Sequence, residues 1–289
     1  MMPEAIASII AELLPLVRGF ARGEYAIALG GAHAKGTADD ESDVDLYLFA
    51  NSVLPAEERT RMVVAFSSEV EGAYSWQDDA PFPDTGTDFH FRGRRIECWL
   101  RNAERVEQTI AECQQGIVKR GFVTWTTTGF YNHCCLSDVK AMVPVEDPSG
   151  IIARWKSQVA VYPGKLRETI INQHLAAAGF WPDNFHYMSA IKRGDVIYTS
   201  GIVQQVVHNL VQVLFALNET YFPGDKQLAQ ALDHLPRQPP RLGERITSLL
   251  LPSPPATPDV LRQQREALRS LLHDVRSMCA TDRDSGGCA

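Results

Sequence analysis

Two aspartates separated by one residue are the groups in this chain best placed to do chemistry. Residues 43–49 read Asp-Val-Asp-Leu-Tyr-Leu-Phe, an alternating pattern that predicts a strand. Asp43 and Asp45 would then share one face, while Val44 and Leu46 turn to the core. Like charges held this close raise one carboxyl pKa unless a cation neutralises them. Carboxylate oxygens suit Mg²⁺, which fills its remaining positions with water and substrate phosphates.

A glycine turn lies just upstream of this pair. The apolar run 25–29 predicts a strand, and Gly30 and Gly31 follow it in a small-residue segment that ends at Gly36. Glycine lets the backbone approach an anion closely, and N–H groups where a turn enters a helix can hold phosphate. Phosphate donors beside metal-binding carboxylates predict a nucleoside triphosphate site. Taken singly, Gly30 and Gly31 would instead be an ordinary turn, and Asp43 and Asp45 would be exposed strand carboxylates.

The segment resembles a known family signature. Gly31-x-x-x-x-Gly36 followed by Ser42-Asp43-Val44-Asp45-Leu46 is similar to the motif of the polymerase-beta-like nucleotidyltransferase superfamily, which is Gly-Ser, a later Gly, then Ser-Asp-x-Asp. The superfamily includes aminoglycoside and lincosamide nucleotidyltransferases, minimal enzymes of toxin–antitoxin pairs, and tRNA-nucleotidyl and poly(A) polymerases. The strong resemblance covers residues 28–49; at domain level the chain resembles the antibiotic-modifying members. It implies a nucleotide-binding role for Gly30, Gly31, Ala32, Lys35, Gly36 and Ser42.

One position departs from the family motif. Ala32 stands where the family carries Ser, so a hydroxyl that family members use on the triphosphate is missing. Backbone donors at Gly31 and Ala32 survive this change. Losing one hydrogen bond to a charged group would weaken the grip on phosphate by about 1.5–3 kcal/mol.

A third carboxylate is expected on a neighbouring strand. Residues 87–91 and 94–100 predict a hairpin that turns at Arg92-Gly93, and Glu97 lies in the middle of its second strand, where charge is disfavoured. The resemblance implies a third acidic residue, used as metal ligand or general base. Glu97 matches it best, and Asp88 competes. Alternatively, Glu97 is a structural carboxylate paired with Arg94 or Arg95.

The helical half contains a second candidate segment, residues 215–226. It resembles a stretch of the helical domains that accompany small-molecule nucleotidyltransferases. By that resemblance Lys226 would reach toward the triphosphate, and Asn218 and Tyr221 would shape the cleft. An equally weighted alternative is structural. Lys226 would then be a solvated charge, and Asn218 and Tyr221 would form a helix C-cap and its packing.

Composition and charge limit the classes of partner and the compartment that we expect. The chain has 289 residues and a formal charge of −7, which disfavours nucleic acid because phosphate backbones require an excess of Lys and Arg. The cysteines lack the spacing of a zinc site. The N-terminus predicts an amphipathic helix without the basic region of a signal peptide, and we expect no run long enough to span a membrane. The expected compartment is the cytoplasm.

The fold class expected is α+β: a nucleotidyltransferase domain with a small mixed sheet over residues 1–146, a helical domain over 147–280 and a disordered tail over 281–289. Residues 72–85 are expected to form a loop, in which Trp76 stacks on a ring of a ligand or, more simply, packs locally. Helices are expected at 56–71, 104–114, 117–128, 148–161, 164–178, 186–192, 196–217, 227–232, 242–250 and 259–279.

The resemblance implies nucleotidyl transfer. Two Mg²⁺ held by Asp43, Asp45 and Glu97 would bridge the triphosphate, with ATP the usual donor, and a hydroxyl of a small molecule would accept the nucleoside monophosphate. The alternatives are transfer to a tRNA end or to a protein, and a nucleotide-binding protein that has lost turnover, which Ala32 would favour. The acceptor and the oligomeric state cannot be read from the sequence.

Overall fold

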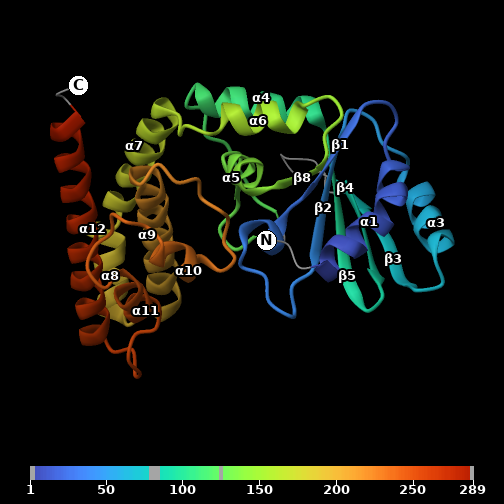
Figure 1. Cartoon of the computed structure of the whole chain (residues 1–289). Helices are drawn as coiled ribbons and strands as arrows, with labels where there is room; N and C mark the ends of the chain where they lie inside the picture. Colours follow the sequence, from blue (N-terminus) through green and yellow to red (C-terminus); the bar gives the residue numbers. More distant parts are fainter. Residues whose placement is uncertain (1–3, 78–84, 124–125, 287–289) are drawn as a thin grey trace. The chain divides into compact units, whose positions relative to one another are not determined.

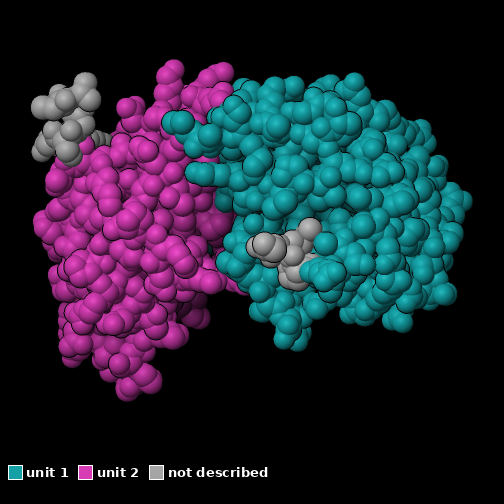
Figure 2. Space-filling view, viewed as in Figure 1, with its two compact units in different colours: residues 1–113, 119–161 teal, residues 114–118, 162–289 magenta. Residues whose placement is uncertain are grey.

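The computed structural model describes residues 4–77, 85–123 and 126–286, with side chains described up to residue 282. The chain divides into two compact units, coloured separately in Figure 2. The first comprises residues 1–113 and 119–161, and the second comprises residues 114–118 and 162–289.

A six-stranded mixed sheet forms the centre of the first unit (Figure 1), in the order β3-β4-β5-β2-β1-β8. The central pair β2–β5 is parallel, and the other pairs are antiparallel. This sheet and the helical second unit confirm the expected α+β class. The strands are β1 (Tyr25–Leu29), β2 (Val44–Ala50), β3 (Val70–Gln77), β4 (Thr85–Phe91), β5 (Arg94–Arg101) and β8 (Val143–Glu146).

One face of the sheet is apolar and packs against α1 (Glu4–Arg18) and α3 (Ala56–Phe66), as Figure 1 shows. Alternation along β2 sends Val44, Leu46 and Leu48 into this core, where all three are fully buried. Asp45 and its same-face neighbours therefore point to the opposite face.

The opposite face is partly covered by later elements of the same unit. Trp155 packs edge-to-face on Phe49 of β2, with ring centroids 5.1 Å apart. The elements that complete the unit are α2 (Gly31–Lys35), α4 (Ala103–Gln114), β6 (Arg120–Gly121), β7 (Phe130–Tyr131), α5 (Cys134–Ala141) and α6 (Ile151–Gln158).

Two expectations for this unit were wrong. Residues 70–77 form strand β3 instead of helix and loop, because Tyr74 and Trp76 pair across to β4; residues 78–84 lie outside the described part. Residues 117–128 form no helix where they are described: Arg120 and Gly121 form strand β6, which pairs with β7 just beyond the segment, and β-branched residues such as Val123 and Thr126 favour extended backbone. Strand β8 and helix α5 were not anticipated.

The named elements in the described part of the second unit are helices joined by loops, at bounds close to those expected. They are α7 (Gly164–Phe180), α8 (Phe185–Arg193), α9 (Val196–Leu217), α10 (Leu228–Asp233), α11 (Leu242–Leu250) and α12 (Pro258–Gly286). Helix α9 is long and apolar enough to cross a membrane, contrary to expectation, but 78% of its most apolar window is buried within the protein. It is the core helix of this unit, and α7 packs along it.

The ends of the second unit also differ from the sequence-based boundaries. Helix α12 continues to Gly286, so the described part of the expected tail is helical, because Asp282 pairs with Arg167 and Arg237. Residues 287–289 lie outside the described part. Helix α6 belongs to the first unit, and the expected domain boundary at residue 146 stays a prediction.

Candidate functional site

A row of polar side chains crosses the sheet on the face opposite α1 and α3. Asp45 of β2 lies directly beside Glu97 of β5, since these strands are parallel neighbours in that register. Glu97 lies beside Asp88 of β4, and Asp88 lies beside Tyr74 of β3. Three carboxylates on adjacent strands thus share one surface.

Asp43, Asp45 and Glu97 come close enough to share a cation. One oxygen from each lies within 4.8 Å of the other two, and all three residues are half-buried. Asp43 directly precedes β2 and therefore joins Asp45 on the same face. Asp88 is not part of this group.

Crowding and burial change the acidity of the cluster. Burial, together with the charges of Asp43 and Glu97, raises the pKa of Asp45 to about 7. Burial and the charge of Asp43 also raise the pKa of Glu97, against the opposing effect of Arg95. A cation bound between these groups would favour their ionised forms and displace their protons into solvent.

The glycine turn is pressed against these groups. Gly31 has φ +55°, and a Cβ built there would lie 1.6 Å from Oδ2 of Asp45. A Cβ on Gly30 would lie 2.1 Å from the ring of Tyr47. The N–H of Gly30 donates to the backbone oxygen of Asp45 at 2.8 Å, and that of Gly31 to the Tyr47 hydroxyl at 3.3 Å. Glycine is therefore required at both positions.

The other expected nucleotide-binding residues of this unit have local partners. Ala32 and Lys35 lie on α2, which ends at the left-handed Gly36. The ammonium of Lys35 lies 3.9 Å from Asp138 of α5. The Ser42 hydroxyl donates to Asp39 at 2.8 Å, within the loop that leads to Asp43.

Three further residues, which sequence reasoning did not single out, lie around the cluster. Arg101 donates two 3.1 Å bonds to Asp138 and lies over the ring of Tyr47, 4.3 Å from its centroid. Its charge lowers the pKa of Asp45, partly offsetting the acidic neighbours. Alternation along the strands places Tyr47 with Asp45 and Arg101 with Glu97, a signal that could have found both. Asp138 gave no such signal.

Asp88 is held by aromatic donors. The Tyr74 hydroxyl donates to Oδ2 at 2.9 Å, and Nε1 of Trp76 donates to Oδ1 at 3.1 Å. Trp76 also meets Trp99 edge-to-face at 4.8 Å, so local packing describes this residue. Arg95 contacts two of the three acids of the row, 2.7 Å from Glu97 and 3.8 Å from Asp88.

The candidates of the second unit have their own local roles. Asn218 caps α9 and exchanges hydrogen bonds with the backbone of Arg237 at 2.7 and 2.9 Å. Tyr221 is buried and stacks on Tyr162, with centroids 4.7 Å apart. Lys226 is exposed, and its expected contact with a triphosphate stays a prediction.

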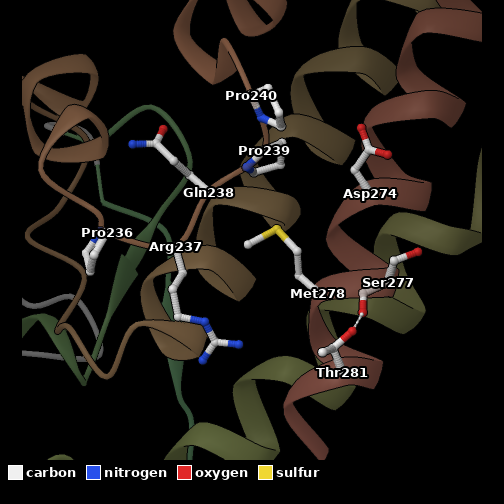
Figure 3. A pocket seen from close by; sticks show the side chains of 9 residues that line it. All are labelled: Pro236, Arg237, Gln238, Pro239, Pro240, Asp274, Ser277, Met278 and Thr281. Carbon is white, nitrogen blue, oxygen red and sulfur yellow. Dashed lines mark hydrogen bonds between the residues drawn. The ribbon is translucent and has the colours of Figure 1, made fainter.

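The second unit also contains an open pocket of about 470 Å³ (Figure 3). Residues 236–240 form one side, and Asp274, Ser277, Met278 and Thr281 of α12 form the other. Arg237 in its lining pairs with Asp282. None of the candidate site residues lines this pocket.

Comparisons with known proteins give a family match and a similar solved structure. A family model described as a domain of unknown function, DUF4037, matches residues 131–228, a region that excludes the three clustered carboxylates. No curated protein matches the sequence. The fold is similar to the crystal structure of a nucleotidyltransferase-like protein from Exiguobacterium sibiricum, with a TM-score of 0.41 and 11% identity, over 96% of this chain and 77% of that one.

Proposed function

We propose that this protein is a Mg²⁺-dependent nucleotidyltransferase that moves a nucleoside monophosphate, AMP from ATP, to a hydroxyl of a small molecule. The observation that carries the proposal is the meeting of Asp43, Asp45 and Glu97, with one oxygen of each within 4.8 Å of the others. The resemblance of residues 31–46 to the superfamily motif supports it from the sequence.

The donor set fits magnesium. Carboxylate oxygens are the hard ligands that Mg²⁺ prefers, and few protein ligands leave positions for phosphate oxygens. The lack of a side chain at Gly31 keeps clear the space beside Oδ2 of Asp45 that a Cβ would fill. When bound, Mg²⁺ would supply charge stabilisation to the triphosphate and to the leaving pyrophosphate.

The protein's own groups would position the reactants and move one proton. Asp43, Asp45 and Glu97 would hold the metal. The acceptor oxygen forms a bond to the α-phosphorus while the bond to the bridging oxygen of the β-phosphate breaks, so that pyrophosphate leaves. The acceptor proton would pass to a carboxylate, for which we assign Glu97.

The acidic balance favours a small acceptor over tRNA or a protein. A formal charge of −7 gives no general attraction to a polyanion, and ATP is instead drawn in by its metal. We place this activity in the cytoplasm, where ATP and Mg²⁺ are abundant.

Two observations favour a second function, nucleotide binding without turnover. Ala32 lacks the hydroxyl of the family motif, and the Gly31 N–H donates to Tyr47. The intact carboxylate cluster opposes this alternative, because binding without catalysis does not require all three acids.

A pyrophosphate-release assay tests the proposed reaction. Purified protein is incubated with ATP, Mg²⁺ and pools of hydroxylated small molecules, and products are identified by mass. We expect acceptor-dependent pyrophosphate release that is lost in Asp45→Asn and Glu97→Gln. Release of phosphate in place of pyrophosphate, or equal activity in the variants, would contradict the proposal; binding of Mg²⁺-ATP with no release from any pool would favour the second function.

A further inference from the structure

Arg95 lies between Glu97, which belongs to the carboxylate cluster, and Asp88, which does not. Its guanidinium lies 2.7 Å from Oε1 of Glu97 and 3.8 Å from Oδ2 of Asp88. The Arg95 side chain is 49% exposed, whereas the Glu97 side chain is 18% exposed. A partly exposed, flexible cation is thus shared between two more buried carboxylates on adjacent strands.

Asp88 is built to receive this cation. Tyr74 and Trp76 fix the two oxygens of Asp88 with one hydrogen bond each. A carboxylate offers about four acceptor positions, so two donors leave room for a guanidinium. Asp88 therefore has a fixed orientation and spare acceptor capacity, while lying outside the group of three.

Glu97, in contrast, has two competing partners. Its oxygen belongs to the carboxylate group that could hold a cation, and it also forms the short ion pair with Arg95. A carboxylate oxygen engaged by a guanidinium is a weaker metal ligand, because the two cations repel each other and compete for the same lone pairs.

We propose that Arg95 is a positioning residue that competes with the metal for Glu97 and transfers to Asp88 when Glu97 binds the metal. Asp88 then acts as the alternative partner of Arg95 and is not a metal ligand. This inference rests on the proposed function, since it concerns the metal of that site. It assigns roles to two residues that the catalytic scheme does not use.

Measuring Mn²⁺ binding tests the inference without any turnover. The electron paramagnetic resonance signal of the free ion reports how much Mn²⁺ remains unbound. The protein is studied as the full chain, free of nucleotide, at pH 8 and in 0.15 M salt. Arg95→Gln should tighten Mn²⁺ binding by roughly two- to fivefold, the range expected for removing one partly exposed ion pair. Arg94→Gln is the charge-matched control, because Arg94 donates to the backbone of Asp40, and it should have a clearly smaller effect.

A double-mutant cycle separates partner exchange from a simple effect of charge. Asp88→Asn should weaken Mn²⁺ binding while Arg95 is present, since Arg95 then has only Glu97 to pair with. In the Arg95→Gln background the same change should have little effect. Additive effects across the cycle, or equal tightening by Arg94→Gln and Arg95→Gln, would overturn the inference.

Failure of the inference and failure of the proposed function give different results. If wild-type protein binds Mn²⁺, Asp45→Asn abolishes binding, and the cycle is additive, only the role of Arg95 is wrong. If the wild type binds no Mn²⁺, both fall together. Thermal unfolding of each variant is measured first; if Asp88→Asn does not fold, the comparison of Arg95→Gln with Arg94→Gln still decides, because both replace partly exposed side chains.

Discussion

The acidity of Asp45 is the residue-scale property with the clearest consequences. Its pKa is raised to about 7 from the ordinary 3.8, first by burial and then by Asp43 and Glu97. A carboxyl whose pKa is raised on folding binds its proton more tightly in the native state. Its contribution to stability is therefore fully present below about pH 3.8 and is lost as the pH rises through about 7.

This predicts a pH-dependent gain in stability for Asp45→Asn in metal-free protein. At pH 8 the ionised wild-type carboxylate is unfavourable, so the variant should be more stable by on the order of 1–3 kcal/mol. At pH 5 the native wild-type group is protonated but the unfolded one is still ionised, so the difference should be smaller than at pH 8 and should vanish only below about pH 3.8. Thermal unfolding in EDTA from pH 5 to 8 measures this.

The matched control is Asp40→Asn, which removes a carboxylate from the exposed loop before the cluster. If both variants shift the unfolding temperature alike at every pH, burial and crowding at Asp45 are not the cause. Adding Mg²⁺ at pH 8 should stabilise the wild type more than Asp45→Asn, since a bound ion favours the native state.

Residue types and their spacing made part of the site predictable. Asp43 and Asp45 were found because strand alternation is a local rule that needs no knowledge of the fold. The meeting of Glu97 with Asp45 depends on β2 and β5 being parallel neighbours, which alternation alone does not reveal. Asp138 was missed because its helix, α5, was not predicted.

At the scale of elements, the glycine turn controls how closely β1 and α2 approach β2. Gly31→Ala should destabilise the protein, because a Cβ would overlap Oδ2 of Asp45 and alanine disfavours φ +55°. Gly36→Ala is the matched control: Gly36 has φ +72°, but a Cβ there meets nothing within 4 Å. Chemical denaturation measures both variants.

We expect Gly36→Ala to cost about 1–2 kcal/mol, the strain of a left-handed alanine. Gly31→Ala should cost at least about 1 kcal/mol more, since its clash adds to the same strain. It should also weaken Mn²⁺ binding, whereas Gly36→Ala should not. Equal costs with unchanged metal binding would show that the close approach to Asp45 has no role.

Elements with strong internal periodicity were predictable, and elements defined by their partners were not. Helix α9 has the bounds expected from its apolar pattern, and the hairpin of β4 and β5 follows from alternation and the turn at Arg92. Strand β3 replaces the expected helix end and loop, because its order comes from pairing with β4. The β6–β7 pair likewise depends on a partner.

At the scale of the whole molecule, the end of the chain contributes to the second unit. Burial alone would disfavour ionisation of Asp282, but hydrogen bonds and charges from Arg167 and Arg237 outweigh it and hold its pKa below the usual value. A carboxyl with a lowered pKa contributes stability above its unfolded value, and this contribution is lost as the pH falls through its folded pKa.

Asp282→Asn should therefore lower the unfolding temperature at pH 7, by about 2–4 °C if the loss is near 1 kcal/mol. The loss should fade below about pH 4. Glu266→Gln on the same helix is the control, because Glu266 is exposed and pairs only at the surface with Arg265 and Arg269. A larger effect of Glu266→Gln would contradict this role of the C-terminal helix.

The central claim is that Asp43, Asp45 and Glu97 form a metal site for a nucleoside triphosphate. Titration calorimetry of ATP into wild-type protein and Asp45→Asn, with Mg²⁺ and with EDTA, tests it most directly. We predict binding to the wild type that requires Mg²⁺ and collapses in the variant. Binding that is equal in both proteins or indifferent to Mg²⁺, or no binding to the wild type, would contradict the claim.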